Sequence, residues 1–439
     1  MRMDMDKLKH RVDHTRTVKL IGKVTKIIGL LIESRGPASS IGDLCLIHPI
    51  NPREPLVTAE VVGFREDVIL LMPLGDLAGI GPGSRVEAMK ESFTVPVGES
   101  LIGRVLDGLG QPIDDKPEPQ CHEFYPVHAS PPNPFTRKRI DTPIGTGVRA
   151  IDGLLTWGKG QRVGIFAGSG VGKSTLLGMI SKNSQADINV IALIGERGRE
   201  VREFIERDLG AEGLARSVIV VATSDQPALV RRQGAYVATA IAEYFRDQGR
   251  NVMFMMDSIT RFCMSQREIG LAVGEPPTTK GYTPSVFALL PKLMERTGTG
   301  SGEGSISALY TVLVDGDDIT EPVADASRSI LDGHIMLSRH IAAKNHFPAI
   351  DVLGSASRVF GEVAPPELQD VAGRMRALLA TYHEAEDLIN IGAYSKGTNK
   401  SIDQAVNRIS AINDFLRQGI NESEKFENIV PLMRKAMGE

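Results

Sequence analysis

Residues 162–180 read RVGIFAGSGVGKSTLLGMI, and this stretch decides the architecture of the middle of the chain. It begins with an apolar run of strand length, continues with a glycine-rich turn and ends with the apolar spacing of a helix. The glycines let successive backbone N–H groups face a phosphate group, and the N-terminus of the helix adds partial positive charge at the same place. We therefore predict a strand, a phosphate-binding loop and a helix, in this order.

The residues of this loop have separate predicted roles. Lys173 is placed to reach the β- and γ-phosphates of a nucleotide, and the Ser174 hydroxyl is placed to bind Mg²⁺. Thr175 comes one position later and is expected to stabilise the first helical turn. Ala167 stands where the motif usually has glycine, and a small residue still fits there. The predicted nucleotide-binding residues of the loop are Gly168, Ser169, Gly170, Val171, Gly172, Lys173, Ser174 and Thr175.

Between about residues 151 and 359, apolar strand-like runs alternate with amphipathic helical segments. Runs that are apolar on both faces are typical of strands in a parallel sheet covered by helices. The strand-like runs that follow the loop are NVIALIG, SVIVVAT, NVMFMMD and ISALYTVLV. The pattern predicts an α/β domain built around a parallel sheet.

Two of these runs deliver carboxylates to their C-terminal ends. Asp257 ends one run, where a carboxylate beside the phosphate loop can hold Mg²⁺; the alternative is a cap of the following helix. Glu196 follows another run and is the candidate that orients the attacking water in hydrolysis. The alternative is that Glu196 pairs with Arg197, Arg199 or Arg202 on the surface.

A further candidate lies in the stretch PAIDVLGSASR, which ends in Arg358 and is well separated from the phosphate loop. An arginine in this place can serve as an arginine finger that is donated to a neighbouring subunit. A surface ion pair is the alternative role of a lone arginine.

The flanking segments differ from this central pattern. Residues 18–93 contain short β-rich runs about ten residues apart, which favours a small antiparallel barrel. Seven prolines between Pro117 and Pro143 predict an extended connector without regular helix or sheet. The last segment, from Glu362 onward, has helical periodicity. We therefore predict four parts, namely residues 1–17, 18–93, 94–361 and 362–439.

The first 17 residues leave two interpretations open. The first 20 positions hold six Lys or Arg and three Asp, and the apolar residues Met5, Leu8 and Val12 fall near one helical face. A solvated terminus and a weakly amphipathic helix that docks on a partner or an anionic membrane surface both fit this pattern.

Composition excludes several classes of protein. The 439 residues include 50 Lys and Arg against 54 Asp and Glu, so no dominant surface for a polyanion is expected. Three widely spaced cysteines form neither a zinc motif nor a disulfide framework, which favours a reducing cytoplasm. No stretch reaches about 18 consecutive apolar residues, so we expect neither a secreted nor a membrane-spanning protein.

Several motifs together resemble the rotary ATP synthase catalytic-subunit superfamily. Within it, the chain is most similar to the type III protein-export ATPases, and to their flagellum-specific members in particular. The superfamily motifs occur in the expected order as GSGVGKST, GERGREV, MFMMD, GEPPTTKGYTPSVFALLPKLMERTG and PAIDVLGSASR. The resemblance to the export ATPases rests on IIGLLIESRGPASSIGDLCLI, LVDGDDITEPVAD and EDLINIGAYSKG.

This resemblance implies a homohexameric ring of RecA-like cores, each with a β-barrel before it and a helical domain after it, and ATP sites between subunits. It makes Glu196 the catalytic carboxylate, Arg197 a neighbour of the γ-phosphate, Asp257 the magnesium carboxylate and Arg358 the finger. Lys173 and Ser174 keep the loop roles given above, and a homohexamer could complete every site because one chain carries both Glu196 and Arg358. The implied adenine-packing residues are Phe347 and, on the other side of the ring, Tyr394.

The resemblance also implies a cellular role. ATP and Mg²⁺ would serve to release export substrates from chaperones and deliver them to a membrane export gate. Implied partners are a stator-like negative regulator and a central-stalk-like protein, with the ring at the inner face of the cytoplasmic membrane. The alternatives are an injectisome export ATPase, a rotary ATP synthase subunit and an RNA-translocating motor. The barrel segment has only Phe64 and Phe93 as aromatic residues, so the stacking platform of an RNA motor is not expected.

Overall fold

The computed structural model describes residues 21–89, 92–168, 170–314, 318 and 320–439. The predicted segment 1–17 and the loop residue Ser169 lie outside the described residues. Two compact units are present, and we describe each by itself. One is the N-terminal part up to Phe93 together with Ile269–Glu275, and the other comprises Thr94–Glu268 and Pro276–Glu439.

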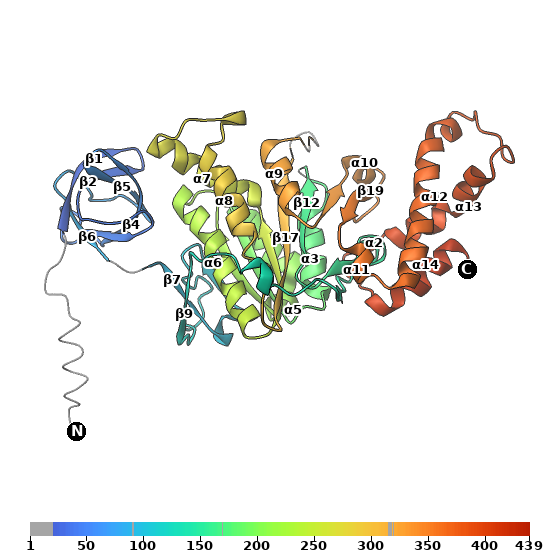
Figure 1. Ribbon diagram of the computed structural model, residues 1–439, viewed down its shortest axis with the longest axis horizontal. Helices are drawn as coiled ribbons and strands as arrows, with labels where there is room; N and C mark the ends of the chain where they lie inside the picture. The colour runs from blue at the N-terminus through green and yellow to red at the C-terminus, as the bar shows by residue number, and fades with distance from the viewer. Residues whose placement is uncertain (1–20, 90–91, 169, 315–317, 319) are drawn as a thin grey trace, which may run out of the picture. The chain divides into compact units, whose positions relative to one another are not determined.

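Six antiparallel strands of the first unit close into a barrel in the order β1-β2-β5-β4-β3-β6 (Figure 1). Alternating residues of these strands point inward and form an apolar core that includes Ile32, Cys45, Val61 and Leu71. The predicted antiparallel barrel is therefore confirmed. The strands are β1 (Ile21–Ile28), β2 (Leu31–Arg35), β3 (Leu44–Ile47), β4 (Val57–Arg65), β5 (Val68–Pro73) and β6 (Arg85–Ala88).

A nine-stranded sheet forms the centre of the second unit, with the order β19-β18-β12-β17-β15-β13-β14-β8 and β16 paired to β17. The strands from β18 to β8 are parallel, whereas β19 runs antiparallel to β18. The predicted α/β core is confirmed. The strands are β8 (Val105–Asp107), β12 (Arg162–Ala167), β13 (Ile188–Ile194), β14 (Ser217–Ala222), β15 (Asn251–Asp257), β16 (Gly298–Thr299), β17 (Ser305–Leu313), β18 (Gly333–Leu337) and β19 (Ile350–Ser357).

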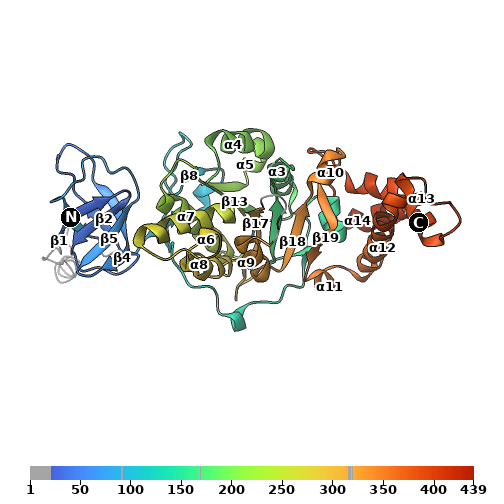
Figure 2. The same cartoon turned by 90° about the horizontal axis from the view of Figure 1, so that it is seen from above.

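Helices cover both faces of this sheet (Figure 2). One face carries α3 (Lys173–Asn183), α4 (Gly198–Glu203) and α5 (Gly210–Leu214). The other face carries α6 (Ala228–Asp247), α8 (Pro284–Met294) and α9 (Pro322–Ile330). Helix α7 (Ile259–Val273) follows β15. Because both faces are covered, strands such as β13 are buried along their whole length.

The proline-rich connector departs from the prediction, because it contains a strand. Strand β9 (Glu123–Pro126) pairs antiparallel with β7 (Thr94–Val97), and Pro134–Thr136 form a 3-10 turn. The expectation that the seven prolines exclude regular sheet from this segment was wrong. A two-stranded ladder leaves half of the backbone N–H groups without a ladder partner, so proline is tolerated there.

The chain then enters the core through β10 (Pro143–Ile144), α2 (Arg149–Leu154) and β11 (Trp157–Gly158). Two short helices, α10 (Arg339–Ala343) and α11 (Phe360–Val363), flank β19 in the sequence. Among the described residues, no helix has the length and apolar character needed to cross a membrane.

The C-terminal segment is helical, as predicted. It consists of α12 (Pro366–Asn390), α13 (Lys400–Leu416) and α14 (Ile429–Met437), which pack on one another and on α2. Buried residues such as Met375, Ile412 and Met433 join the apolar core of the nucleotide-binding part.

Candidate nucleotide site

The predicted phosphate loop connects β12 to α3. Strand β12 is held between β17 and β18 by parallel pairing, so its end at Ala167 is fixed in the middle of the sheet. Gly170 and Gly172 have φ angles of 79° and 87°, in the left-handed region that favours glycine. Helix α3 begins directly afterwards at Lys173, and its N-terminus adds partial positive charge at the loop.

Three side chains meet beside the loop, one from the first residue of α3 and two from the C-terminal ends of β13 and β15. The Lys173 Nζ atom lies 2.5 Å from an Asp257 carboxylate oxygen and 3.6 Å from a Glu196 carboxylate oxygen. All three side chains are at most 14% exposed. They meet because β13 and β15 are adjacent parallel strands, and their C-terminal ends lie at the same end of the sheet as the loop. This proximity of Lys173, Glu196 and Asp257 is what the nucleotide-site prediction requires.

Electrostatics differ among these three groups. Burial, together with the nearby Asp257, raises the pKa of Glu196 to about 7. Burial acts to lower the pKa of Lys173, but the charges of Asp257 and Glu196 outweigh it and raise that pKa. Lys173 therefore stays positively charged, and Glu196 has a basicity suited to polarising a water molecule near neutral pH.

The oxygen ligands present fit a magnesium ion. Asp257 stands at the end of β15, where the Thr311 hydroxyl donates a 2.7 Å hydrogen bond to its carboxylate. Ser174 lies in the first turn of α3, next to Lys173. Within the described ranges, no three His, Cys, Asp or Glu residues form a metal cage. Mg²⁺ commonly binds through one or two protein oxygens plus substrate phosphates, so this sparse oxygen set suits it.

The arginines that follow Glu196 form an array of ion pairs on the surface. Arg197 is 76% exposed and pairs with Glu200 at 3.1 Å, whereas Glu196 pairs with Lys173. The array continues along α4 and the π-helical turn Phe204–Leu209. Its other pairs are Arg199 with Glu203 and Arg202 with Glu206. Thus Arg197 does not join the Lys173 cluster in this structure.

Phe347 borders the same loop from another direction. A methyl group added at Gly172 would lie 3.6 Å from the Phe347 ring, so the ring stands against the last glycine of the loop. The Phe347 carbonyl accepts a 2.9 Å hydrogen bond from the backbone N–H of Gln418. This bond places the segment that follows α13 beside Phe347.

Gln418 was not among the predicted site residues. It is buried, its side-chain oxygen accepts from the Arg149 N–H, and its side-chain nitrogen donates to the carbonyls of Gly147 and Glu422. Two positions later, Ile420 is 52% exposed. No sequence motif marks Gln418, because its importance comes from contacts between segments about 270 residues apart.

Tyr394 occupies a different place. Its hydroxyl donates to the Asn399 carbonyl at 2.9 Å and lies 3.0 Å from the Asp403 carboxylate. These bonds fix it in the loop between α12 and α13, which stands at the far end of the helical part from α3 in both views (Figures 1 and 2). The structure therefore does not bring Tyr394 to the phosphate loop.

Arg358 lies at the end of the sheet that is opposite to the phosphate loop, where β12 and β18 begin. It follows β19, whose antiparallel pairing sets Ser357 against Gly333 at the start of β18, and its N–H donates to the Asp332 carbonyl. The phosphate loop follows the other end of β12, and a strand of this length spans roughly 20 Å. The side chain, which donates to the Arg328 carbonyl, cannot reach the loop of its own chain.

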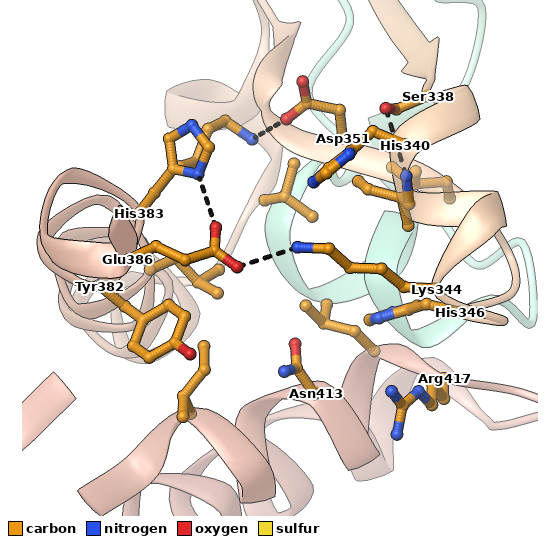
Figure 3. Close-up of a pocket in the computed structure, with 17 residues that line it drawn as sticks. Ser338, His340, Lys344, His346, Asp351, Tyr382, His383, Glu386, Asn413 and Arg417 are labelled. Carbon is orange, nitrogen blue, oxygen red and sulfur yellow. Dashed lines mark hydrogen bonds and ion pairs between the residues drawn. The ribbon is translucent and has the colours of Figure 1, made fainter. Parts of the chain in front are cut away.

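A cleft of about 490 Å³ separates α10 and β19 from α12 and α13 (Figure 3). Lys344, directly after α10, crosses it to pair with Glu386 on α12 at 2.9 Å, and His383 lies 3.7 Å from the same carboxylate. Burial lowers the pKa of His346, which lines the cleft directly before Phe347. The cleft contains none of the phosphate-loop residues or the two site carboxylates.

Three family models match the chain. The ATP synthase alpha/beta family, nucleotide-binding domain, covers residues 147–357, and the beta-barrel domain of that family covers residues 24–90. The T3SS EscN ATPase C-terminal domain covers residues 364–435. The last match shows that the C-terminal helical domain of this chain is of the type found in type III secretion ATPases.

Individual proteins agree with these matches. The flagellum-specific ATP synthase of Bacillus subtilis is 58% identical over 97% of both chains. The type 3 secretion system ATPase of Xanthomonas euvesicatoria is 52% identical over 94% of this chain and 93% of that one. The assembled ATPase EscN of enteropathogenic E. coli superposes with a TM-score of 0.89 at 46% identity, over 95% of this chain and all of that chain. The chain therefore belongs to the ATP synthase alpha/beta family, among its type III export ATPases.

Proposed function

We propose that this ATPase hydrolyses MgATP at sites shared between identical subunits of a hexameric ring, and that the ring energises the export of flagellar proteins. One observation carries the shared-site proposal. Lys173, Glu196 and Asp257 meet where the parallel strands end, while Arg358 lies where these strands begin, at the opposite end of the same sheet. A site that uses all four residues therefore needs two copies of the chain.

The chemistry follows from the placement of each group. The loop N–H groups and Lys173 bind the phosphates, and Glu196 orients a water in line with the γ-phosphoryl group. Ser174 and Asp257 would hold Mg²⁺, which supplies charge neutralisation at the β- and γ-phosphates. Arg358 of the adjacent subunit stabilises the charge of the transition state. Arg197 reaches the γ-phosphate in this proposal once its surface pair with Glu200 opens.

The adenine is proposed to pack on Phe347. The position of this ring beside Gly172 and its partial exposure, 42%, support the assignment. The second face of the base is proposed to pack on the segment around the exposed Ile420. The hydrogen bond between the Gln418 N–H and the Phe347 carbonyl supports this assignment, because Gln418 is two residues before Ile420. The hydroxyl bonds of Tyr394 within its own loop do not support the role that the sequence suggested for it.

Relatives support the cellular side of the proposal. EscN has been solved as an assembled ATPase and in complex with its central stalk EscO, which supports a ring and a stalk-like partner here. The 58% identity to a flagellum-specific relative, against 52% to a secretion-system relative, favours flagellar export over an injectisome. We further propose export chaperones and their substrates, a stator-like negative regulator and a membrane export gate as partners. The ring would act in the cytoplasm at the inner face of the membrane.

A mixing experiment tests the shared site. Glu196→Gln and Arg358→Ala should each be inactive alone, but mixed rings contain interfaces with a wild-type Glu196 from one copy and a wild-type Arg358 from the next. Random 1:1 assembly should restore up to about one quarter of wild-type ATPase activity, since each interface combines two independent choices. The control is a mixture of Glu196→Gln with Lys173→Ala. Both variants keep Arg358, and both changes affect the same side of the interface, so no interface in this mixture is complete. No recovery in the first mixture would contradict the proposal.

A further inference from the structure

Phe135 is the most exposed large apolar side chain of the described residues. It lies in the 3-10 turn Pro134–Thr136 of the connector, and its side chain is fully exposed, at 100%. A single exposed apolar residue is common and by itself means little. The surroundings of this one give it significance, because hydrogen bonds fix the backbone of its turn and the next residues attach the connector to the core.

Local hydrogen bonds fix the turn. The Asn133 side chain accepts the Phe135 N–H at 2.9 Å, and the Thr136 hydroxyl donates to the Asn133 carbonyl at 2.8 Å. Pro134 restricts the backbone directly before the phenyl group. A turn whose backbone is already fixed loses little further backbone entropy when a partner covers its side chain.

Contacts after the turn attach the connector to the core. Arg137 donates to the carbonyls of Thr297 and Glu295, and the Thr299 hydroxyl donates to the Lys138 carbonyl at 2.7 Å. These contacts reach the loop between α8 and β17. In Figure 2 the connector, drawn in teal, projects beyond α8 and α9 on the face of the sheet that these helices cover.

A chain of ion pairs leads from this attachment to Arg358. The Glu295 carboxylate that contacts Arg137 also lies 2.6 Å from Arg162, and Arg162 pairs with Asp332 at 3.1 Å. The Asp332 carbonyl accepts the Arg358 N–H. Arg137, two residues after Phe135, and Arg358 are thus both attached to the end of the sheet where β12, β17 and β18 begin.

We infer that Phe135 docks on the adjacent copy of this chain, in the same interface into which Arg358 reaches. The inference rests on the proposed shared site. Arg358 cannot reach its own phosphate loop, so a second copy must approach this end of the sheet, and the projecting Phe135 then meets that copy. The phenyl group contributes to assembly through apolar burial, and it takes no part in the reaction itself.

The experiment compares specific ATPase activity across protein concentration for wild type, Phe135→Ser and Phe124→Ser. Phe124 is a matched control, because it is a 65% exposed phenylalanine that lies in β9, which pairs with β7, and outside the turn Pro134–Thr136. We expect Phe135→Ser to raise the concentration of half-maximal activity about tenfold or more, where tenfold corresponds to about 1.4 kcal/mol. Its plateau activity should remain within about twofold of wild type, since the catalytic groups are intact. Phe124→Ser should match wild type. Phe135→Leu keeps an apolar side chain, so its concentration of half-maximal activity should stay close to that of wild type.

Two results would overturn the inference. One is an unchanged midpoint for Phe135→Ser, and the other is an equal shift for Phe124→Ser. If the mixture of Glu196→Gln and Arg358→Ala regains activity while Phe135→Ser shows no shift, only this inference fails. If that mixture stays inactive and wild-type activity does not depend on concentration, the shared site itself fails, and this inference falls with it.

Discussion

At the residue scale, Lys173 stands between two carboxylates that repel each other beside the phosphate loop. Its single positive charge contacts both Asp257 and Glu196 and offsets one of their two negative charges. The pKa of Glu196 is raised to about 7, because Glu196 is buried and stands near Asp257. The same environment that makes its charge costly makes the carboxylate basic enough to orient water.

Glu196→Gln should retain ATP binding and lose hydrolysis by at least about 10²-fold, since the amide keeps the shape of the carboxylate but is a much weaker base. Nucleotide binding and steady-state phosphate release measure the two effects separately. Glu203→Gln is the matched control, because Glu203 pairs with the exposed Arg199 on the surface array. Normal turnover by Glu196→Gln would remove Glu196 from the reaction.

At the element scale, strand β8 joins the sheet by pairing with β14, and a charged pair links the residue before β8 to the segment that follows it. Arg104 donates to both Asp114 oxygens, at 2.8 and 2.7 Å, and both side chains are only 8% exposed. The Arg104 hydrogen bond lowers the pKa of Asp114 to about 2. Because the ordinary value is about 3.9, the pair stabilises the folded state above about pH 4, and this contribution is lost as the pH falls toward 2.

Asp114→Asn should therefore lower the free energy of unfolding at pH 7 by about 3 kcal/mol, because it leaves a nearly buried guanidinium without its counter-charge. Thermal unfolding at several pH values measures this. The difference between wild type and variant should be constant from pH 7 to about 5 and should shrink below about pH 4. Asp370→Asn is a suitable control, since Asp370 is 68% exposed in its pair with Arg374. A difference that grows on acidification would contradict the assignment.

At the scale of the whole molecule, the two halves of the proposed site, the Lys173 cluster and Arg358, lie at opposite ends of the strands of one sheet. A rigid sheet cannot fold back to join Arg358 to the phosphate loop, so in the proposed shared site the adjacent copy has to supply Arg358. Enzymatic activity then depends on the fraction of chains that are assembled.

The specific ATPase activity of the purified chain should accordingly rise with protein concentration until it reaches a plateau. Measurement of the oligomer by sedimentation at the same concentrations should give a parallel curve. Arg358→Ala should assemble over the same range and remain inactive, with turnover reduced by about 10³-fold or more. Constant specific activity down to concentrations at which the chain is monomeric would show that one copy is sufficient.

Sequence alone determined the local conformation of this protein. The glycines at 170 and 172, the apolar runs and the helical periodicity specify the strand, loop and helix without reference to distant residues. Prediction was less accurate in the connector, where the pairing of β9 with β7 outweighed the local effect of the prolines. Only the tertiary structure decided that Glu196 pairs with Lys173 and not with the neighbouring arginines, that Gln418 stands beside Phe347, and that Arg358 lies at the far end of the sheet. The physical reason is that strand order and packing between distant segments set these distances, whereas spacing along the chain constrains only near neighbours.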